Sequence, residues 1–277
     1  TLRNQLMIPL PFYAPLDTLP GLELNELIQY LFIFFLSSIR LSSFLLSSPF
    51  LGSRNVPLTA KIVFSMVLCF FNFGYVSNFE ITPSFMDNLI IIIFTEILVG
   101  VASGLTLTIW FSAASMAGEK IAASTGLGFS ALVDPETGGQ TPVISIVMDL
   151  FLLTIFVSLN GHLIAIDFIM KSHEILEMGS RLPSMALVGV GIEAAGAMFY
   201  AAGLIMLPVV GALMLSNVAV GVITKSAPQL NLFSFGFPIS LILAFVILFL
   251  STRSIGGTFA ELTNNALSTL ESILGII

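Results

Sequence analysis

The sequence predicts an all-α protein of the membrane class, built from hydrophobic helical hairpins. Of its 277 residues, 56% are apolar and only 9% are charged, and the mean hydropathy is +1.04. A soluble domain carries about a quarter charged residues to solvate its surface, so most of this surface must face lipid or other subunits. The apolar segments are long and lack strict alternation, which argues against membrane strands.

A single helical unit is expected, because no polar stretch is long enough to hold a soluble domain. Its prolines interrupt the first segment, which therefore does not resemble a signal peptide. The expected segments are a proline-rich N-terminal segment (1–26), N-terminal hydrophobic helices (27–111), a plug-like loop region (112–142), C-terminal hydrophobic helices (143–253) and an amphipathic C-terminal helix (254–277).

Hydrophobic helices are expected wherever the chain approaches the roughly twenty mostly apolar residues of a membrane helix. These stretches are Leu27–Phe50, Lys61–Tyr75, Leu89–Phe111, Val143–Leu159 with an extension to Met170 left open, Ala194–Ile223 and Phe233–Leu250. The last stretch, Ser254–Ile277, repeats apolar residues at helical spacing among polar ones, which predicts an amphipathic helix. Its apolar positions are Phe259, Leu262, Ala266, Leu267, Leu270, Ile273 and Leu274.

Four charged residues lie inside or at the edge of apolar runs: Arg40, Glu96, Asp149 and Glu193. A charge at the centre of a bilayer costs about 2.5–3.5 kcal/mol on insertion scales. We therefore expect these side chains to face protein or water and to pair. A G-x-x-x-G pattern at Gly100 and Gly104 would let helix backbones approach closely. Together these features predict helices that pack mainly against other helices.

Composition also argues against several classes of function. The net charge of −7 argues against nucleic-acid binding and against a polybasic lipid anchor. Cys69 is the only cysteine, so no intrachain disulfide forms, and we expect it to be a small buried residue. Two histidines and one cysteine allow no zinc-ligand spacing. Asn160-Gly-His162, with Asp167 nearby, lacks a nucleophile motif, and His162 is expected to be a helix-end histidine.

The stretch Gly118–Pro142 combines turn residues with apolar ones. A long helix through it is improbable because of Gly126, Gly128, Gly138 and Gly139, with Pro135 and Pro142. Leu127 and Phe129 nevertheless make it too apolar for an ordinary solvent-exposed loop. Non-helical backbone at membrane depth is tolerated only inside protein or beside a water-filled cavity. Two interpretations stay open: a re-entrant loop that closes a pore, and an ordinary loop outside the membrane.

Two other stretches predict helical hairpins. Ser47–Pro57 contains two prolines and a glycine and is followed by Lys61, so it connects two hydrophobic helices; plain loop chemistry and a binding role are equally open there. In Asn217–Pro238, Lys225 complements a helix dipole and Pro228 ends the helix. The tip of this second hairpin is polar, with Lys225, Gln229 and Asn231.

A series of motifs occurs in order and at familiar spacing: Gly126-Leu-Gly-Phe-Ser, Asp134-Pro135, Gly138–Pro142, Asn160-Gly-His162, Ala227-Pro-Gln-Leu-Asn231 and Gly236-Phe-Pro238. They resemble the FliR family, the flagellar member of the T-component of type III secretion export gates. The resemblance runs from about Leu27 to Leu250. The DP-x-x-GG loop and the prolyl-glutaminyl hairpin are quite specific together, whereas either alone would be weak.

The resemblance implies a protein similar to a fusion of the FliP-like and FliQ-like gate subunits. Such a subunit completes a hetero-oligomeric helical ring around a closed pore for unfolded flagellar proteins, in the bacterial inner membrane at the flagellar basal body. It implies FliP-like, FliQ-like and FlhB-like partners, export substrates in transit and membrane lipids, and neither a cofactor nor enzymatic activity. The implied plug contains Gly126, Leu127, Gly128, Phe129, Asp134, Pro135, Gly138, Gly139 and Pro142.

Packing in such a ring suggests the hypothesis that at least some of Arg40, Glu96, Asp149 and Glu193 pair across subunit interfaces. Three other functions stay open. A secondary transporter also uses broken helices and intramembrane charges, although no internal repeat is found. A virulence-type secretion system shares the gate architecture. A membrane-embedded enzyme is the third alternative, but it lacks a metal or nucleophile constellation.

Overall fold

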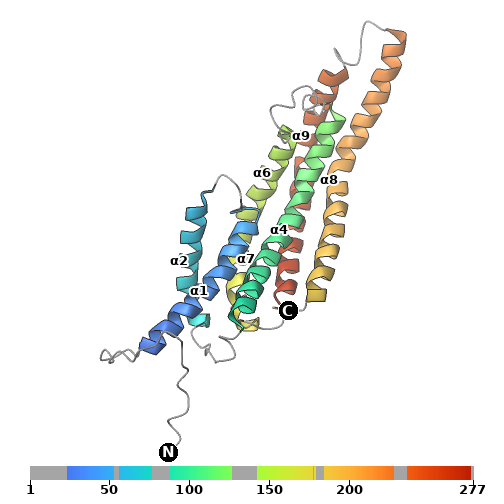
Figure 1. Ribbon diagram of the computed structural model, residues 1–277. Helices are drawn as coiled ribbons and strands as arrows, with labels where there is room; N and C mark the ends of the chain where they lie inside the picture. The colour runs from blue at the N-terminus through green and yellow to red at the C-terminus, as the bar shows by residue number, and fades with distance from the viewer. Residues whose placement is uncertain are drawn as a thin grey trace, which may run out of the picture. The chain divides into compact units, whose positions relative to one another are not determined.

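The computed structural model describes residues 24–52, 56–76, 88–126, 142–176, 178, 184–227 and 236–275. Every regular element within these ranges is an α-helix, which confirms the predicted all-α class. The helices are α1 (Leu24–Ser47), α2 (Leu58–Val76), α4 (Leu89–Ser124), α6 (Val143–Ser158), α7 (Gly161–Ile175), α8 (Ser184–Ser226) and α9 (Phe237–Ile273). Figure 1 shows them in chain order from blue to red.

Both predicted hairpins are confirmed, and three helix boundaries were predicted wrongly. α1 packs on α2, and α8 packs on α9 (Figure 1). α4 continues to Ser124 instead of ending at Phe111, and its extension packs closely on α6, where a Cβ at Gly118 would meet the backbone of Ser145. α8 begins at Ser184 and contains Pro208, and α9 runs from Phe237 to Ile273 without the break expected near Leu250.

The open question at Leu159 is answered by a separate helix. α6 and α7 meet at a bend of 67°, and Asn160 adopts a left-handed backbone with φ of 57° between them. Asparagine is one of the few residues that tolerates this conformation. His162 lies in the first turn of α7, as expected of a helix-end histidine.

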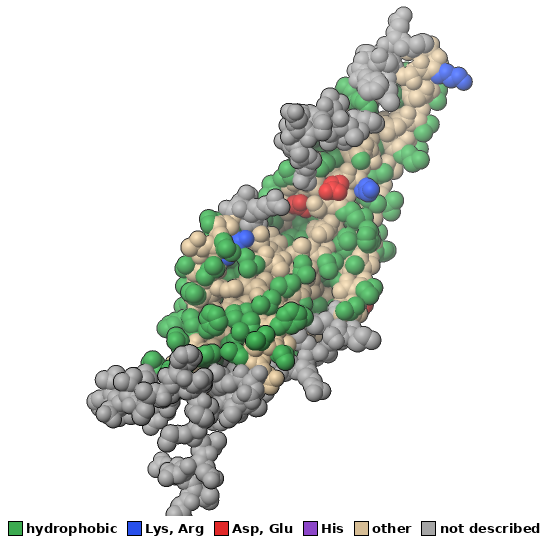
Figure 2. Space-filling model, viewed as in Figure 1, with side chains coloured by type: hydrophobic (Ala, Val, Ile, Leu, Met, Phe, Trp, Pro, Cys, Tyr) green, Lys and Arg blue, Asp and Glu red, His purple; other side chains and the backbone are tan. Residues whose placement is uncertain are grey.

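Four helices are long and apolar enough to cross a membrane, and the bent pair α6–α7 makes a fifth when taken as one span. Their segments are Leu27–Ser47, Leu89–Ser124, Val188–Ser226 and Phe237–Ile273. Figure 2 shows the consequence on one face, where hydrophobic side chains spread over the described surface and charged ones are sparse. This chain is a membrane protein by the length and composition of its helices.

The helices form two compact units. The first contains α1, α2, α4 up to Gly104 and α7 from Phe168. Its core includes a cluster of Ile33 and Leu36 on α1, Ile92 on α4 and Met178. Cys69 on α2 is buried, and its thiol donates a hydrogen bond to the Phe34 carbonyl at 3.2 Å, in agreement with its predicted structural role.

The second unit contains α4 from Leu105, α6, α7 up to Asp167, α8 and α9. α6 packs on α9, and the ring of Phe151 meets that of Phe259 edge to face at 5.4 Å. Phe111 on α4 and Phe156 on α6 make a similar contact at 5.0 Å. The amphipathic pattern at the end of the chain is confirmed, because its apolar face is buried on α9: Phe259, Leu262, Ala266, Leu267 and Leu270.

Candidate functional site

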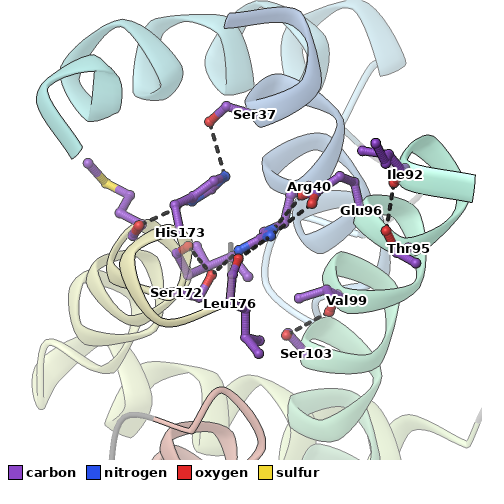
Figure 3. A network of polar contacts seen from close by, with 12 residues as sticks. Ser37, Arg40, Ile92, Thr95, Glu96, Val99, Ser103, Ser172, His173 and Leu176 are labelled. Carbon is purple, nitrogen blue, oxygen red and sulfur yellow. Dashed lines mark hydrogen bonds and ion pairs between the residues drawn. The ribbon is translucent and has the colours of Figure 1, made fainter. Parts of the chain in front are cut away.

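A buried ion pair joins α1 and α4 in the first unit. Arg40 Nε donates to Glu96 Oε2 at 2.6 Å and Arg40 Nη2 donates to Glu96 Oε1 at 2.9 Å (Figure 3). Each side chain is only 1% exposed. Two parallel N–H···O bonds of this kind fix the guanidinium and the carboxylate in one plane, which makes the pair directional as well as strong.

Small residues on α4 allow close contact with α1 beside the ion pair. Gly100 lies one turn beyond Glu96, and a Cβ added there would meet the Arg40 carbonyl and the side chain of Ser43. Gly104 lies equally close to the backbone of α1 at Phe44. The predicted close approach at G-x-x-x-G is therefore confirmed, and its partner is α1.

α7 completes the surroundings of Arg40. Nη1 donates to Ser172 Oγ at 3.0 Å, and Nη2 donates to the Leu176 carbonyl at 2.9 Å. The guanidinium thus has acceptors at all three nitrogens, from α4, from α7 and from the residue that follows α7. A buried arginine satisfied in this way fixes how three chain segments pack and leaves little donor capacity for a ligand.

His173 forms a second buried polar contact beside the ion pair. Its Nε2 lies 3.1 Å from Ser37 Oγ on α1, and its Nδ1 lies 3.2 Å from Asn72 Nδ2 on α2. Figure 3 shows Ser37, Arg40, Ser172 and His173 gathered between their helices. The Asn72 Oδ1 atom is buried and has no hydrogen-bond partner among the described residues. Polar side chains from α1, α2, α4 and α7 therefore meet in one network inside the first unit.

Sequence reasoning missed most of this network. It selected Arg40 and Glu96 for their charge, but not Ser37, Asn72, Ser172 or His173. One signal was present: Ser37 and Arg40 are three residues apart, and so lie on the same face of α1. His173 stands between Lys171 and Glu174 in the sequence and so resembles a solvated helix end, yet it is buried.

Arg40 and Glu96 have their charge partners within this chain, which accounts for both without a neighbouring subunit. Asp149 on α6 is half-buried and accepts a hydrogen bond from Ser115 Oγ on α4 at 3.1 Å. Gly118 lets α4 approach the backbone of α6 at Ser145 there. Glu193 is exposed on α8. For Asp149 and Glu193, pairing across a subunit interface stays a prediction.

The structure describes only the two ends of the predicted plug. Gly126 follows α4 with φ of +85°, and Pro142 directly precedes α6. The other predicted plug residues lie outside the described residues: Leu127, Gly128, Phe129, Asp134, Pro135, Gly138 and Gly139. In the predicted hairpin tip, Lys225 is exposed in the last turn of α8. Pro228, Gln229 and Asn231 also lie outside the described ranges.

The starting point of the predicted plug is tied to the second hairpin. Asn217 on α8 donates from Nδ2 to the Ser124 carbonyl at 3.4 Å and accepts a hydrogen bond from Ser240 Oγ on α9 at 2.9 Å. The ring of Phe237 lies against Gly126, where a side chain would meet it. The end of α4, the part of α8 at Asn217 and the start of α9 are thereby held together at the point where the predicted plug begins.

Comparison with known proteins agrees with this architecture. The family model of the bacterial export proteins, family 1, matches residues 31–266. Flagellar biosynthetic protein FliR of Bacillus subtilis (strain 168) is 28% identical over 260 residues, covering 92% of this chain and 99% of that protein. The FliR protein of Escherichia coli (strain K12) is 29% identical and covers 78% and 83%. That of Aquifex aeolicus (strain VF5) is 30% identical and covers 80% and 86%.

Proposed function

Because this chain belongs to the FliR family of bacterial export proteins, we propose that it is a non-enzymatic core subunit of the flagellar type III protein export gate. It assembles with FliP-like and FliQ-like subunits around a closed pore for unfolded flagellar proteins, and it contacts an FlhB-like subunit. It resides in the bacterial inner membrane at the flagellar basal body. The observation that carries the proposal is the family match across residues 31–266, together with FliR relatives aligned over most of their length.

The burial pattern supports a subunit of a larger assembly. α8 and α9 are long apolar helices, yet only 22% of the most hydrophobic 18-residue stretch of each is buried within this chain. Large apolar side chains such as Phe199, Tyr200 and Phe249 are exposed on them. Either lipid or other subunits must cover these faces, and neighbouring helices would do so in a ring.

The ends of the segment Gly126–Pro142 support a gating role for it. The positive φ of Gly126 turns the chain sharply out of α4, and hydrogen bonds through Asn217 hold that point against α8 and α9. A segment anchored in this way can close a pore while its ends stay fixed to the helices. We assign the plug to residues between these anchors.

Affinity purification in mild detergent tests the proposal. The tagged chain should retain FliP-like, FliQ-like and FlhB-like subunits, which mass spectrometry would identify, and cells without the chain should lose flagellar export. A matched sample extracted in a harsh detergent controls for nonspecific recovery. If the chain is recovered without any of these subunits, the assignment to an export gate is wrong.

A secondary transporter is the second candidate, and the bent pair α6–α7 is the observation that favours it. A 67° bend at a short break resembles the broken helices that transporters use at their binding sites. Solute counterflow by the purified chain alone in vesicles would support the transporter. Export of flagellar proteins that depends on the chain, without counterflow, would support the gate.

A further inference from the structure

A half-polar pocket of about 320 Å³ lies between α4, α8 and α9 in the second unit. Its volume exceeds the roughly 30 Å³ that a water molecule occupies in the liquid, so it can hold a whole side chain. The polar groups that line it are Trp110, Glu193, Asn265, Ser268, Thr269 and Ser272. No lysine or arginine is among its lining residues, so the described part of this chain supplies no counter-ion to the carboxylate.

Glu193 is the charge that needs a partner. It is exposed on α8 and makes no hydrogen bond or ion pair with any residue that the structure describes. Its neighbours on α8 are apolar and exposed, with Val188 62% and Ile192 69% exposed. A carboxylate in such a surface is costly when lipid covers it, and it is stabilised when a cation meets it.

Trp110 gives an independent sign that the pocket is incomplete. It lies in the pocket wall and is 7% exposed, and its indole Nε1 has no hydrogen-bond partner in the described parts of the chain. A buried indole N–H usually finds an acceptor, because leaving it unpaired forfeits a hydrogen bond that water would otherwise supply. Lysine and arginine side chains carry no acceptor, so the acceptor for this N–H has to be another oxygen of the partner, such as a backbone carbonyl, and Trp110 shows only that the pocket is incomplete.

The remaining polar groups suit a cation. Hydroxyls of Ser268, Thr269 and Ser272 and the amide oxygen of Asn265 are hydrogen-bond acceptors on α9. With the Glu193 carboxylate, they can accept the several N–H groups of an ammonium or a guanidinium. The whole chain has nine basic and sixteen acidic residues, so its excess negative charge also favours cations supplied by a partner.

We propose that this pocket receives a lysine or arginine side chain from an apolar helix of a neighbouring membrane subunit, which pairs with Glu193. The inference rests on the proposed function, since it requires a neighbouring subunit. The exposed apolar residues beside Glu193 pack against the partner helix, while the basic side chain reaches into the pocket. This contact fixes the rotation of α8 and α9 against that subunit.

Photocrosslinking in native membranes identifies the occupant. A benzophenone amino acid replaces Ala197, which lines the pocket one helical turn from Glu193. The expected adduct is a membrane helix of another gate subunit, with a lysine or arginine within one turn of the crosslinked residue. An adduct with lipid alone, or with a helix that lacks a basic residue there, overturns the proposal.

Charge reversal tests the pairing itself. Glu193→Lys should reduce recovery of the crosslinked subunit about tenfold or more, since loss of a desolvated charge pair changes affinity by at least that factor. Glu261→Lys is the matched control, because Glu261 is an exposed glutamate on α9 outside the pocket. Reversing the identified partner residue to glutamate should restore recovery of the Glu193→Lys chain, which also shows that this chain folds.

The outcomes separate the two proposals. If the unaltered chain recovers its gate subunits and Glu193→Lys recovers them equally well, the pairing is wrong and the export-gate function stands. Failure of the reversed partner to rescue Glu193→Lys also overturns the pairing. If the unaltered chain recovers no gate subunit, the proposed function itself fails.

Discussion

Arg40 and Glu96 are 56 residues apart in the chain and meet in a bidentate ion pair at 2.6 and 2.9 Å. Both lie in apolar helices and are 1% exposed. An isolated charge in this position would be strongly destabilising, whereas the pair with its additional hydrogen bonds to α7 is satisfied. Each buried charge would be costly alone, but the pairing compensates both and defines how α1, α4 and α7 pack.

Replacing Glu96 with glutamine should destabilise the chain. The substitution leaves the Arg40 guanidinium buried without a counter-ion, and breaking a buried pair in this way costs about 3–5 kcal/mol. Thermal unfolding of the detergent-extracted protein should shift to lower temperature, and less chain should accumulate in membranes. Glu261→Gln, on the exposed side of α9, is the control and should change stability by no more than about 0.5 kcal/mol.

A double replacement separates charge from packing at the same position. Arg40→Met combined with Glu96→Leu removes both charges and should recover much of the loss, because apolar groups of similar volume often replace a buried pair without penalty. Glu96→Arg should instead disrupt assembly of the gate by placing two cations together. Unchanged co-purification of Glu96→Arg with the gate subunits would contradict a role for Glu96 in assembly.

Gly100→Ala should weaken the contact between α1 and α4. The new methyl group would meet the Arg40 carbonyl and Ser43, and overpacking of this kind costs about 1–3 kcal/mol. Thermal unfolding measures the loss. Gly203→Ala on α8 is the matched control, since nothing lies within 4 Å of its added Cβ, and helix propensity predicts a gain of up to about 1 kcal/mol. Equal effects at both glycines would refute the packing argument.

Gly126→Ala should strain the start of the predicted plug. Alanine disfavours the φ of +85° seen there, and its methyl group would also meet the Phe237 ring. The two effects are separable, because Phe237→Ala removes the steric contact but leaves the backbone strain, which costs about 1–2 kcal/mol. We expect Gly126→Ala to lower the unfolding temperature less in the Phe237→Ala background than in the unaltered chain, each measured against the parent that keeps Gly126. Identical shifts would show that the ring contact contributes nothing.

Deleting the predicted plug should make the membrane leaky. A short glycine-serine linker between Gly126 and Pro142 would keep both anchors while removing the residues that we assign to closure. Cells carrying this variant should show increased entry of ions or small solutes under conditions in which the complex assembles. A scrambled segment of the same length and composition is the control for assembly. An intact permeability barrier with a fully assembled complex would refute the plug assignment.

Some of the residues of the site could be predicted from the sequence, but not which helices they bring together. Arg40 and Glu96 could be selected as residues needing partners because a charge is conspicuous in an apolar run. Gly100 and Gly104 could be selected as a close-approach surface because of their spacing. Neither pattern specified α1 as the helix that meets α4. Ser37 gave only the signal of its three-residue spacing from Arg40, and Asn72 and Ser172 gave none, since single serines and asparagines occur in many hydrophobic helices.

Helix lengths were less predictable where local signals conflicted with packing. The sequence places residues 112–142 in a plug-like loop region, yet α4 continues through Gly118 to Ser124, and the backbone of α6 approaches it at Gly118. The sequence predicts a division of this segment near Leu250, because the hydrophobic first half of α9 gives way to an amphipathic second half. The change is one of environment along a continuous helix, and hydropathy cannot distinguish this from a break.

The sequence by itself determined the class of the protein, its two helical hairpins and the amphipathic end of α9. These properties follow from hydrophobicity summed over a segment and from local turn chemistry, so they need no knowledge of distant residues. Only the tertiary structure decided that Arg40 pairs with Glu96, that His173 is buried beside Ser37 and Asn72, and that Glu193 is left without a partner among the described residues. Those outcomes depend on the rotation and depth of each helix against its neighbours, which close packing at positions such as Gly100 sets.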